Sequence, residues 1–337
     1  MIFFSIIIPV YNSEKTIKRL LESILKQNFN DYEVIVINDG STDKSEEVIL
    51  NYKNKFNNYQ YIFKENSGVS STRNIGIKKA LGKYILFADA DDFFEENSFF
   101  RIYEFTKKNN SSLVCFDYYK YFLNGKKIIG LNLKNDCLQM NSNKAITNFL
   151  NYQYINQLTG AIWNKLYETD IIRRNNIEFS TNLLIGEDLL FNIEYFSCVD
   201  KVDLFGEGLY DYVQSENSIM RSYRKNNVEH IKNYAPALKS IFEKYNYQNY
   251  YEILLQFYIS NLFGVIINET LSKGYFYGKK NINSFCQHAL NRDVFCSQSI
   301  KNMKLKYAVY YFLIKSRLWR IVYFFMYLQN NFNYRKK

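Results

Sequence analysis

A short run of carboxylates gives this chain its clearest chemical signal. The segment Asp89-Ala90-Asp91-Asp92 directly follows the apolar run Tyr84–Phe87, which predicts a buried strand. Acids that crowd at the exposed end of a strand repel one another unless a positive group lies among them. Two carboxylates one residue apart suit a hard divalent cation, typically Mg²⁺ or Mn²⁺, that takes its other ligands from water and phosphate groups. The alternative is a solvated acidic turn, because Asp is also common in turns.

The elements that would position these acids alternate between strand and helix. Strands that alternate with helices predict an α/β fold with a mostly parallel sheet flanked by helices. In such sheets, ligands bind at the carboxyl ends of the strands. We expect strands over Phe3–Val10, Tyr32–Asn38, Tyr59–Lys64 and Tyr84–Ala88, and helices over residues 13–26, 43–52 and 70–81, the first capped by Ser13.

Polar segments follow three of these strands, so one crevice could collect Pro9–Asn12, Asn38–Ser41 and Asp89–Asp92. A fourth contribution comes from the loop before the third helix. Gly68 permits close backbone approach there, and the N–H groups of the helix that follows point toward the loop. Arg73, one turn into that helix, could reach a diphosphate, although a surface arginine is the favoured interpretation of that position taken alone.

Beyond residue 95 the pattern is less regular. Helices are expected over 97–109 and 142–151 and a strand over 113–122, while 225–337 is predominantly helical. Aromatic residues make up 18% of the chain and only 2 residues are Pro, which argues against disorder. The 5 Cys residues form no C-x-x-C pair, so they predict reduced thiols in a cytoplasmic protein. The N-terminus has no signal-peptide pattern and is interpreted as the first strand.

The net charge of +10 is unevenly distributed. Residues 221–337 hold 19 Lys and Arg residues against 5 Asp and Glu residues, which predicts a separate role for this region. Within it, the aromatic segment Leu305–Leu328 contains four basic residues, too many for a transmembrane helix. It favours a helix at the surface of an anionic membrane, with a packed core helix as the alternative; nucleic-acid binding is not expected.

Four early segments together carry a family resemblance. Ser5–Asn12, Val36–Asp43, Asn66–Gly76 and Asp89–Asp92 closely resemble, in order and spacing, the family 2 inverting glycosyltransferases of the GT-A fold, of the type that builds bacterial cell-surface and capsular polysaccharides. Ala161–Tyr167 and Ile185–Phe191 resemble the later signatures of the same family. The resemblance covers about residues 1–222. It implies a GT-A catalytic domain over 1–222, followed by a helical, basic and aromatic region over 223–337.

The resemblance also implies roles for individual residues. Asp188 would be the catalytic base, and Asp91 with Asp89 would bind Mn²⁺ or Mg²⁺. Asp92 would be a second ligand or a helix cap. Implied contacts to the nucleotide sugar are Pro9, Tyr11, Asp39, Ser41, Gly68, Arg73 and Asp89, and implied contacts to the acceptor or transferred sugar are Trp163, Lys165 and Glu187.

Several of these positions have structural alternatives. Tyr11 could stack on a base or be an ordinary exposed turn aromatic. Asp39 could accept hydrogen bonds from a uracil N–H or a ribose hydroxyl, or only cap a turn. Trp163 could pack on a sugar or lie in the core, and Lys165 could meet a phosphate. The pair Glu187-Asp188 could simply be acids at a helix N-terminus, where they favour the dipole.

The expected function is transfer of a hexosyl or N-acetylhexosaminyl group from a nucleotide-diphosphate donor, with UDP implied by the family. The acceptor would be a lipid-linked oligosaccharide or polysaccharide at the cytoplasmic face of the membrane, contacted through residues 300–330, and an oligomer is compatible with the sequence. A sugar-phosphate nucleotidyltransferase is disfavoured, because Pro9–Asn12 stands where that class carries a Gly-rich, Arg-containing loop. The remaining alternative is a degenerate, non-catalytic partner subunit.

Overall fold

The computed structural model describes most of the N-terminal two thirds of the chain and parts of the remainder. The helix expected over 142–151 and the domain boundary expected at 222/223 lie outside the described residues. The described residues are 1–140, 160–183, 186–214 and 227–247, with shorter stretches between 250 and 324.

The chain divides into two compact units. The first comprises Met1–Ile146 and Tyr152–Ser218, and the second comprises Thr147–Asn151 and Ile219–Lys337. The candidate site residues all belong to the first unit, so the two units are described separately.

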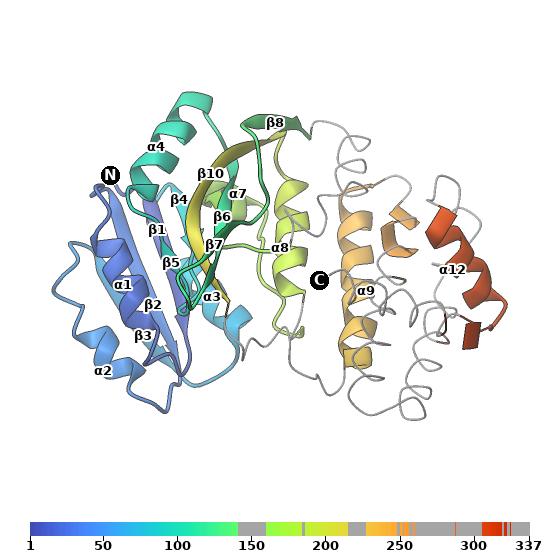
Figure 1. Ribbon diagram of the computed structural model, residues 1–337, viewed down its shortest axis with the longest axis horizontal. Coiled ribbons are helices and arrows are strands. Elements are labelled where there is room, and N and C mark those ends of the chain that lie inside the picture. Colours follow the sequence, from blue (N-terminus) through green and yellow to red (C-terminus); the bar gives the residue numbers. More distant parts are fainter. Residues whose placement is uncertain are drawn as a thin grey trace. The chain divides into compact units, whose positions relative to one another are not determined.

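One ten-stranded sheet forms the framework of the described part of the first unit (Figure 1). The strand order is β3-β2-β1-β4-β9-β6-β10-β5, with β7 beside β6 and β8 beside β10. The strands are β1 (Phe4–Val10), β2 (Tyr32–Asp39), β3 (Tyr59–Lys64), β4 (Tyr84–Phe87), β5 (Phe93–Phe94), β6 (Leu113–Phe122), β7 (Lys127–Ile129), β8 (Asp136–Gln139), β9 (Lys165–Glu168) and β10 (Lys201–Gln214).

Strand direction brings the candidate site to one edge of this sheet. The four strands β1 to β4 run parallel, and β10 runs parallel to β6. Because β9 is antiparallel to both β4 and β6, these last two strands point the same way. The segments that follow β1, β2, β4 and β6 therefore meet at the carboxyl edge. The α/β class is confirmed, although the sheet is more mixed than expected.

Helices cover both faces of the sheet. Apolar side chains of α1, α2 and α4 join one core with β1, β2 and β4. On the opposite face α3 approaches β1 closely at Gly76, where a Cβ atom would lie 2.4 Å from Ile7. The ring of Phe191 on α8 packs against Phe87 of β4 on that same face. The helices of this unit are α1 (Ile17–Leu25), α2 (Ser45–Leu50), α3 (Val69–Lys79), α4 (Ser98–Asn109), α7 (Thr169–Arg174) and α8 (Glu187–Phe196).

The start of the first helix differs from the prediction. The α1 helix begins at Ile17, and Ser13 lies in the turn before it. The carbonyl of Ser13 accepts hydrogen bonds from the N–H groups of Thr16 and Ile17, while its hydroxyl donates to the carbonyl of Tyr11. The expected N-cap at Ser13 is wrong because its side chain stabilises the turn after β1.

The second unit contains two longer described helices, α9 (Asn227–Lys244) and α12 (Leu305–Lys315). The α12 helix has a buried face and an exposed apolar face. Among the described residues, no helix combines the length and apolar content needed to span a bilayer. The buried residues of α12 are Tyr310, Tyr311 and Ile314, and its exposed apolar residues are Leu305, Val309 and Phe312.

Candidate active site

The loops after β1 and β2 are tied together at the carboxyl edge. The backbone N–H of Asn12 donates to Oγ of Ser41 at 3.0 Å, and Oδ1 of Asn12 accepts from the N–H of Thr42 at 2.8 Å. Asn12 adopts a left-handed conformation with φ of 48°. Next to this junction the side chain of Tyr11 is 52% exposed, so its ring is available to a ligand. Pro9 lies in β1, two residues before that ring.

Asp39 fixes the loop that starts α3. Its buried carboxylate accepts hydrogen bonds from the N–H groups of Ser67 at 2.9 Å and Gly68 at 3.0 Å, and it also contacts the ammonium of Lys64. Gly68 has a φ of 93° at the N-terminus of α3, a conformation that suits glycine. Asp39 therefore has a clear structural task, and its expected contact with a nucleoside remains a prediction.

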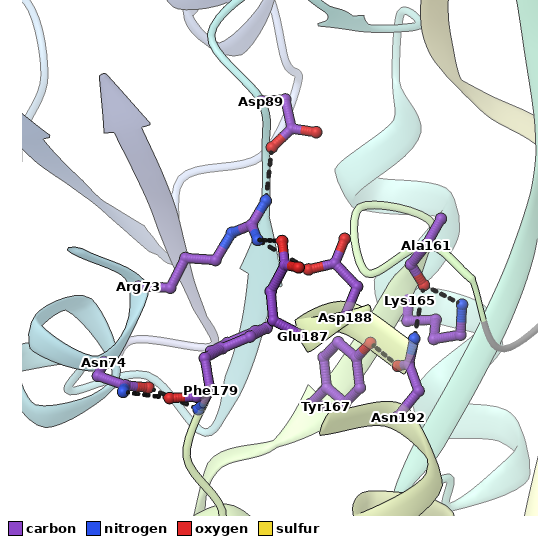
Figure 2. Close-up of polar contacts among 10 residues, drawn as sticks. All are labelled: Arg73, Asn74, Asp89, Ala161, Lys165, Tyr167, Phe179, Glu187, Asp188 and Asn192. Atoms are coloured by element: carbon purple, nitrogen blue, oxygen red, sulfur yellow. Dashed lines mark hydrogen bonds and ion pairs between the residues drawn. The ribbon is translucent and has the colours of Figure 1, made fainter. Parts of the chain in front are cut away.

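Arg73 connects three segments that are distant in the sequence (Figure 2). Its side chain is only 5% exposed, and Nη1 lies 2.7 Å from Oδ1 of Asp188 and 3.6 Å from Oε1 of Glu187. Nη2 lies 3.1 Å from Oδ1 of Asp89. The arginine of α3 thus joins the loop after β4 to the first turn of α8. This convergence brings together the expected base and one of the expected metal ligands.

Phe179 and Asn74 support the arginine. The guanidinium carbon of Arg73 lies 5.3 Å from the centroid of the Phe179 ring, which in turn stacks on Phe191 at 4.1 Å. The amide of Asn74 donates to the carbonyl of Phe179 at 2.9 Å and accepts from its N–H at 2.8 Å. Asn74 therefore fixes the backbone of the residue under Arg73.

Burial and neighbouring charges shape the protonation of this cluster. Burial alone would lower the pKa of Arg73, but Asp188, Asp89 and Glu187 raise it above its ordinary value. Burial raises the pKa of Asp188 to about 7. Arg73 and Lys165 oppose that rise, whereas Glu187 and Asp89 add to it. A carboxyl group with this pKa can exchange a proton near neutral pH, as a general base must.

Asp89 and Asp91 form the candidate metal pair. The backbone N–H of Asp89 donates to the hydroxyl of Tyr210 at 3.0 Å, and the carbonyl of Asp91 accepts from Arg19. Desolvation and the Asp89 carboxylate raise the pKa of Asp91, as expected for two acids close together. Among the described residues no three His, Cys, Asp or Glu side chains surround a metal position. Two carboxylates fit a cation that completes its shell with water and phosphate oxygens.

Asp92 has neither of the two roles expected for it. Its side chain is buried, and Oδ1 accepts a hydrogen bond from the N–H of Val213 on β10 at 2.8 Å. Burial, with Asp91 and Asp89 nearby, raises its pKa well above the ordinary value. The following helix begins at Ser98. Asp92 thus ties the loop after β4 to β10, and we correct both the ligand and the cap interpretations.

Trp163 lies in the core, which is one of the two positions that the sequence left open for this residue. Its side chain is 7% exposed and belongs to the apolar cluster of the first unit. The rings of Tyr210 and Tyr212 stack on it at 5.0 Å and 5.1 Å, and Tyr118 packs against it edge-on. These rings leave little of the indole surface for a sugar.

Lys165 also occupies a different place from the one expected. It is fully buried on β9, where its ammonium donates to the carbonyl of Ala161 and to Oδ1 of Asn164 at 2.9 Å. Burial lowers its pKa to about 8. A lysine with these hydrogen bonds does not present its charge to a phosphate. The expected phosphate contact of Lys165 is therefore wrong.

The fold and the site together define a class of protein. Its α/β sheet gathers acids, a buried arginine and a glycine-led helix at the carboxyl edge, where open α/β sheets bind their ligands and where a helix N-terminus can meet a phosphate. The chain belongs to glycosyl transferase family 2, whose model matches residues 5–173. This match confirms the family expected from the motifs.

Curated relatives agree with this assignment. The glycosyltransferase EpsJ of Bacillus subtilis is 30% identical over 242 residues, which cover 72% of this chain and 70% of EpsJ. A cholesterol galactosyltransferase of Borreliella burgdorferi is 30% identical over 229 residues, which cover 65% of this chain and 62% of that protein.

Solved structures show the same fold. TarS of Staphylococcus aureus, residues 1–349 in complex with UDP, gives a TM-score of 0.69 at 22% identity and covers 98% of this chain and 92% of that one. The same TarS fragment with UDP-GlcNAc gives a TM-score of 0.60 at 21% identity, with 84% and 89% covered. These similarities confirm the expected GT-A fold.

Proposed function

We propose that the protein is an inverting glycosyltransferase that moves a hexosyl or N-acetylhexosaminyl group from a UDP-sugar to a hydroxyl group. The observation that carries the proposal is the meeting of Asp89 and Asp188 at Arg73, because it brings a candidate donor-binding acid and a candidate base to one guanidinium. UDP as the nucleotide draws support from the UDP and UDP-GlcNAc complexes of TarS.

In the proposed reaction, Asp188 removes the proton of the acceptor hydroxyl as that oxygen attacks the anomeric carbon. The attack comes from the face opposite the departing nucleotide, so a single displacement inverts the configuration. Asp89 and Asp91 would hold Mn²⁺ or Mg²⁺, and a cation bound there would neutralise charge on the leaving diphosphate. Arg73, whose pKa is raised, stays positive throughout and lies beside Asp89 and Asp188.

The exposed edge residues would bind the rest of the donor. The half-exposed ring of Tyr11 is suited to stack on the base, beside the junction of Asn12 and Ser41. Gly68 opens α3, and apart from its chain neighbours no described residue comes within 4 Å of the position of its missing Cβ, which leaves room for a ligand to approach the backbone. Asp39 would hold this loop and use its remaining lone pairs for the nucleoside.

Replacing the base tests this proposal. Asp188→Asn should reduce transfer by about 10²–10⁴-fold, the usual contribution of a general base, while the affinity for UDP with Mn²⁺ changes little. Product release from a panel of UDP-sugars measures the first quantity and titration calorimetry the second. Glu187→Gln is the matched control and should keep a substantial rate. Full activity of Asp188→Asn would show that another group is the base.

A lipid-linked oligosaccharide or polysaccharide acceptor at the cytoplasmic face of the membrane belongs to the same proposal. Its support is the exposed apolar face of α12, including Phe312 at 57% exposure, beside the exposed basic residues Lys315, Arg317 and Arg320. Such a face suits the surface of an anionic bilayer. We place this contact within the residue range 300–330, with self-association as an alternative use of that face.

Vesicle flotation distinguishes these uses. Phe312→Asp should weaken binding of the full chain to phosphatidylglycerol vesicles, whereas Leu123→Asp, at an exposed apolar residue of the first unit, should not. Equal binding by both variants would remove the membrane contact from the proposal. A change in oligomeric state of Phe312→Asp, measured by light scattering without vesicles, would favour self-association. A non-catalytic partner subunit would bind vesicles yet show no metal-dependent hydrolysis of any UDP-sugar.

A further inference from the structure

Lys165 is a fully buried cation that the proposed reaction does not use directly. Its ammonium donates to the carbonyl of Ala161, and the same carbonyl accepts a second hydrogen bond from Nδ2 of Asn192 at 3.0 Å (Figure 2). Oδ1 of Asn192 accepts a hydrogen bond from the hydroxyl of Tyr167 at 2.6 Å. One continuous network therefore connects two residues of β9 with a residue of α8.

This network reaches the expected base through the geometry of α8. Asn192 follows Asp188 by four residues, so both side chains lie on the same face of the helix, one turn apart. The α8 helix starts at Glu187, directly before Asp188, and helix ends fray more easily than helix middles. A hydrogen-bonded anchor one turn inside the helix thus restrains the turn that carries the base.

Charge adds a second contribution. A buried cation without a carboxylate partner is unusual, because burial of a charge costs free energy unless a partner compensates it. Among the described residues, Lys165 donates hydrogen bonds to two neutral acceptors, Ala161 and Asn164, and the charge of Asp188 also acts on it. The negative form of Asp188 is the compensating charge.

We propose that Lys165 is a positioning residue for Asp188: it anchors α8 through the carbonyl that it shares with Asn192, and its ammonium stabilises the ionised form of the base. The inference rests on the proposed function, in which Asp188 is the base.

Within the part of the chain that the structure describes, charged and titratable groups face this pair from several elements. The groups that act on Asp188 are Arg73 from α3, Asp89 from the loop after β4, Lys165 and Tyr167 from β9, and Glu187 from its own helix. Facing Lys165 are Asp188 and the thiol of Cys115 on β6, whose pKa burial raises to about 11. Removal of Lys165 therefore leaves Arg73 as the single cation acting on Asp188 among these groups.

The decisive experiment follows the ionisation of Asp188 by ¹³C NMR in protein labelled at the aspartate carboxyl carbons, with Asp188→Asn used to assign the signal. Lys165→Met should raise the titration midpoint by about half a pH unit or more, roughly a threefold change in proton affinity. Lys78→Met, at an exposed lysine paired with Glu178, is the matched control and should leave the midpoint unchanged.

Tyr167→Phe separates charge from packing. It removes the hydrogen bond to Asn192 but keeps the ammonium, so we expect a lower melting temperature with an almost unchanged midpoint. An unchanged midpoint in Lys165→Met would overturn the inference, as would an equal shift in Tyr167→Phe. Neither result would touch the proposed function, which fails instead if Asp188→Asn retains full transfer activity.

Discussion

Nη1 of Arg73 lies 2.7 Å from Oδ1 of Asp188, although 115 residues separate them in the chain. The arginine thereby acts on the charge of the expected base as well as contacting Asp89 in the loop after β4. A substitution at Arg73 would therefore alter proton transfer even if donor binding were unaffected. The pH dependence of the reaction is the observable that reports on this relationship.

The first prediction concerns that pH dependence. Since burial raises the pKa of Asp188 to about 7, the rate of UDP-sugar hydrolysis or transfer should rise as pH increases from 5.5 to about 8, because the base must lose its proton. Glu187→Gln removes an acid that raises this pKa, so its profile should move to lower pH. Initial rates across this range, at saturating Mn²⁺, measure both effects. Identical pH–rate profiles for Glu187→Gln and wild type would contradict the assignment of the rise in rate to Asp188.

The second prediction concerns Arg73 and stability. Arg73→Met leaves Asp89, Glu187 and Asp188 without their common cation, and breaking a buried ion pair costs about 3–5 kcal/mol. The loss in the free energy of unfolding should be smaller at pH 5 than at pH 8, because Asp188, with its raised pKa, is neutral at the lower pH. Urea denaturation at both values measures the difference. Arg73→Lys, which keeps one charge but not the double contact, should fall between Met and wild type.

The third prediction concerns Asn74. Asn74→Ala removes both hydrogen bonds to Phe179 and should lower the free energy of unfolding by about 2–4 kcal/mol, because two buried backbone groups lose their partners. The rate should also fall, since Phe179 underlies the guanidinium of Arg73. Ser71→Ala on the same helix removes only an exposed hydroxyl contact with Ser67 and serves as the control. A rate equal to wild type would show that Phe179 does not position Arg73.

The local sequence pattern was sufficient to predict many strands of the sheet. The strands Tyr59–Lys64 and Leu113–Phe122 have the bounds that the sequence predicts, because each is an apolar or aromatic run with clear polar limits. The 14-residue strand β10 was missed. It contains Gly206 and Gly208 as well as the buried acid Asp211, and these residues interrupt the pattern of a strand. The partners that allow an acid to be buried there come from other strands.

The motifs predicted which residues form the site, but they did not predict the contacts between those residues. The sequence placed Asp89, Asp188 and Arg73 in one region, yet nothing local indicates that one guanidinium holds both acids. Trp163 and Lys165 illustrate the converse. A Trp and a Lys beside a motif look the same whether they face a ligand or a core, and only the surrounding rings and carbonyls of distant strands distinguish the two.

The last prediction concerns an ionic cluster away from the site, in which Asp211 is fully buried and its partners are partly exposed. The ammonium of Lys127 on β7 contacts Glu95 and lies 3.0 Å from Oδ2 of Asp211 on β10. Burial and a hydrogen bond shared with Glu95 raise the pKa of Asp211 to about 7. The folded protein thus binds this proton more tightly than the unfolded chain, so the Asp211 contribution to stability is present below pH 4 and is lost as pH rises toward 7.

Asp211→Asn should remove that loss. An Asn side chain can accept from Lys127 through Oδ1 and donate to Glu95 through Nδ2, as the protonated acid does. We therefore expect the variant to be more stable than wild type at pH 7.5 and its stability to fall less between pH 5 and 7. Guanidinium denaturation at several pH values measures this difference, with Asp203→Asn on the same strand as the control. A parallel pH dependence in Asp211→Asn and wild type would mean that Asp211 is already ionised at pH 5, with Lys127 outweighing both burial and the neighbouring carboxylate.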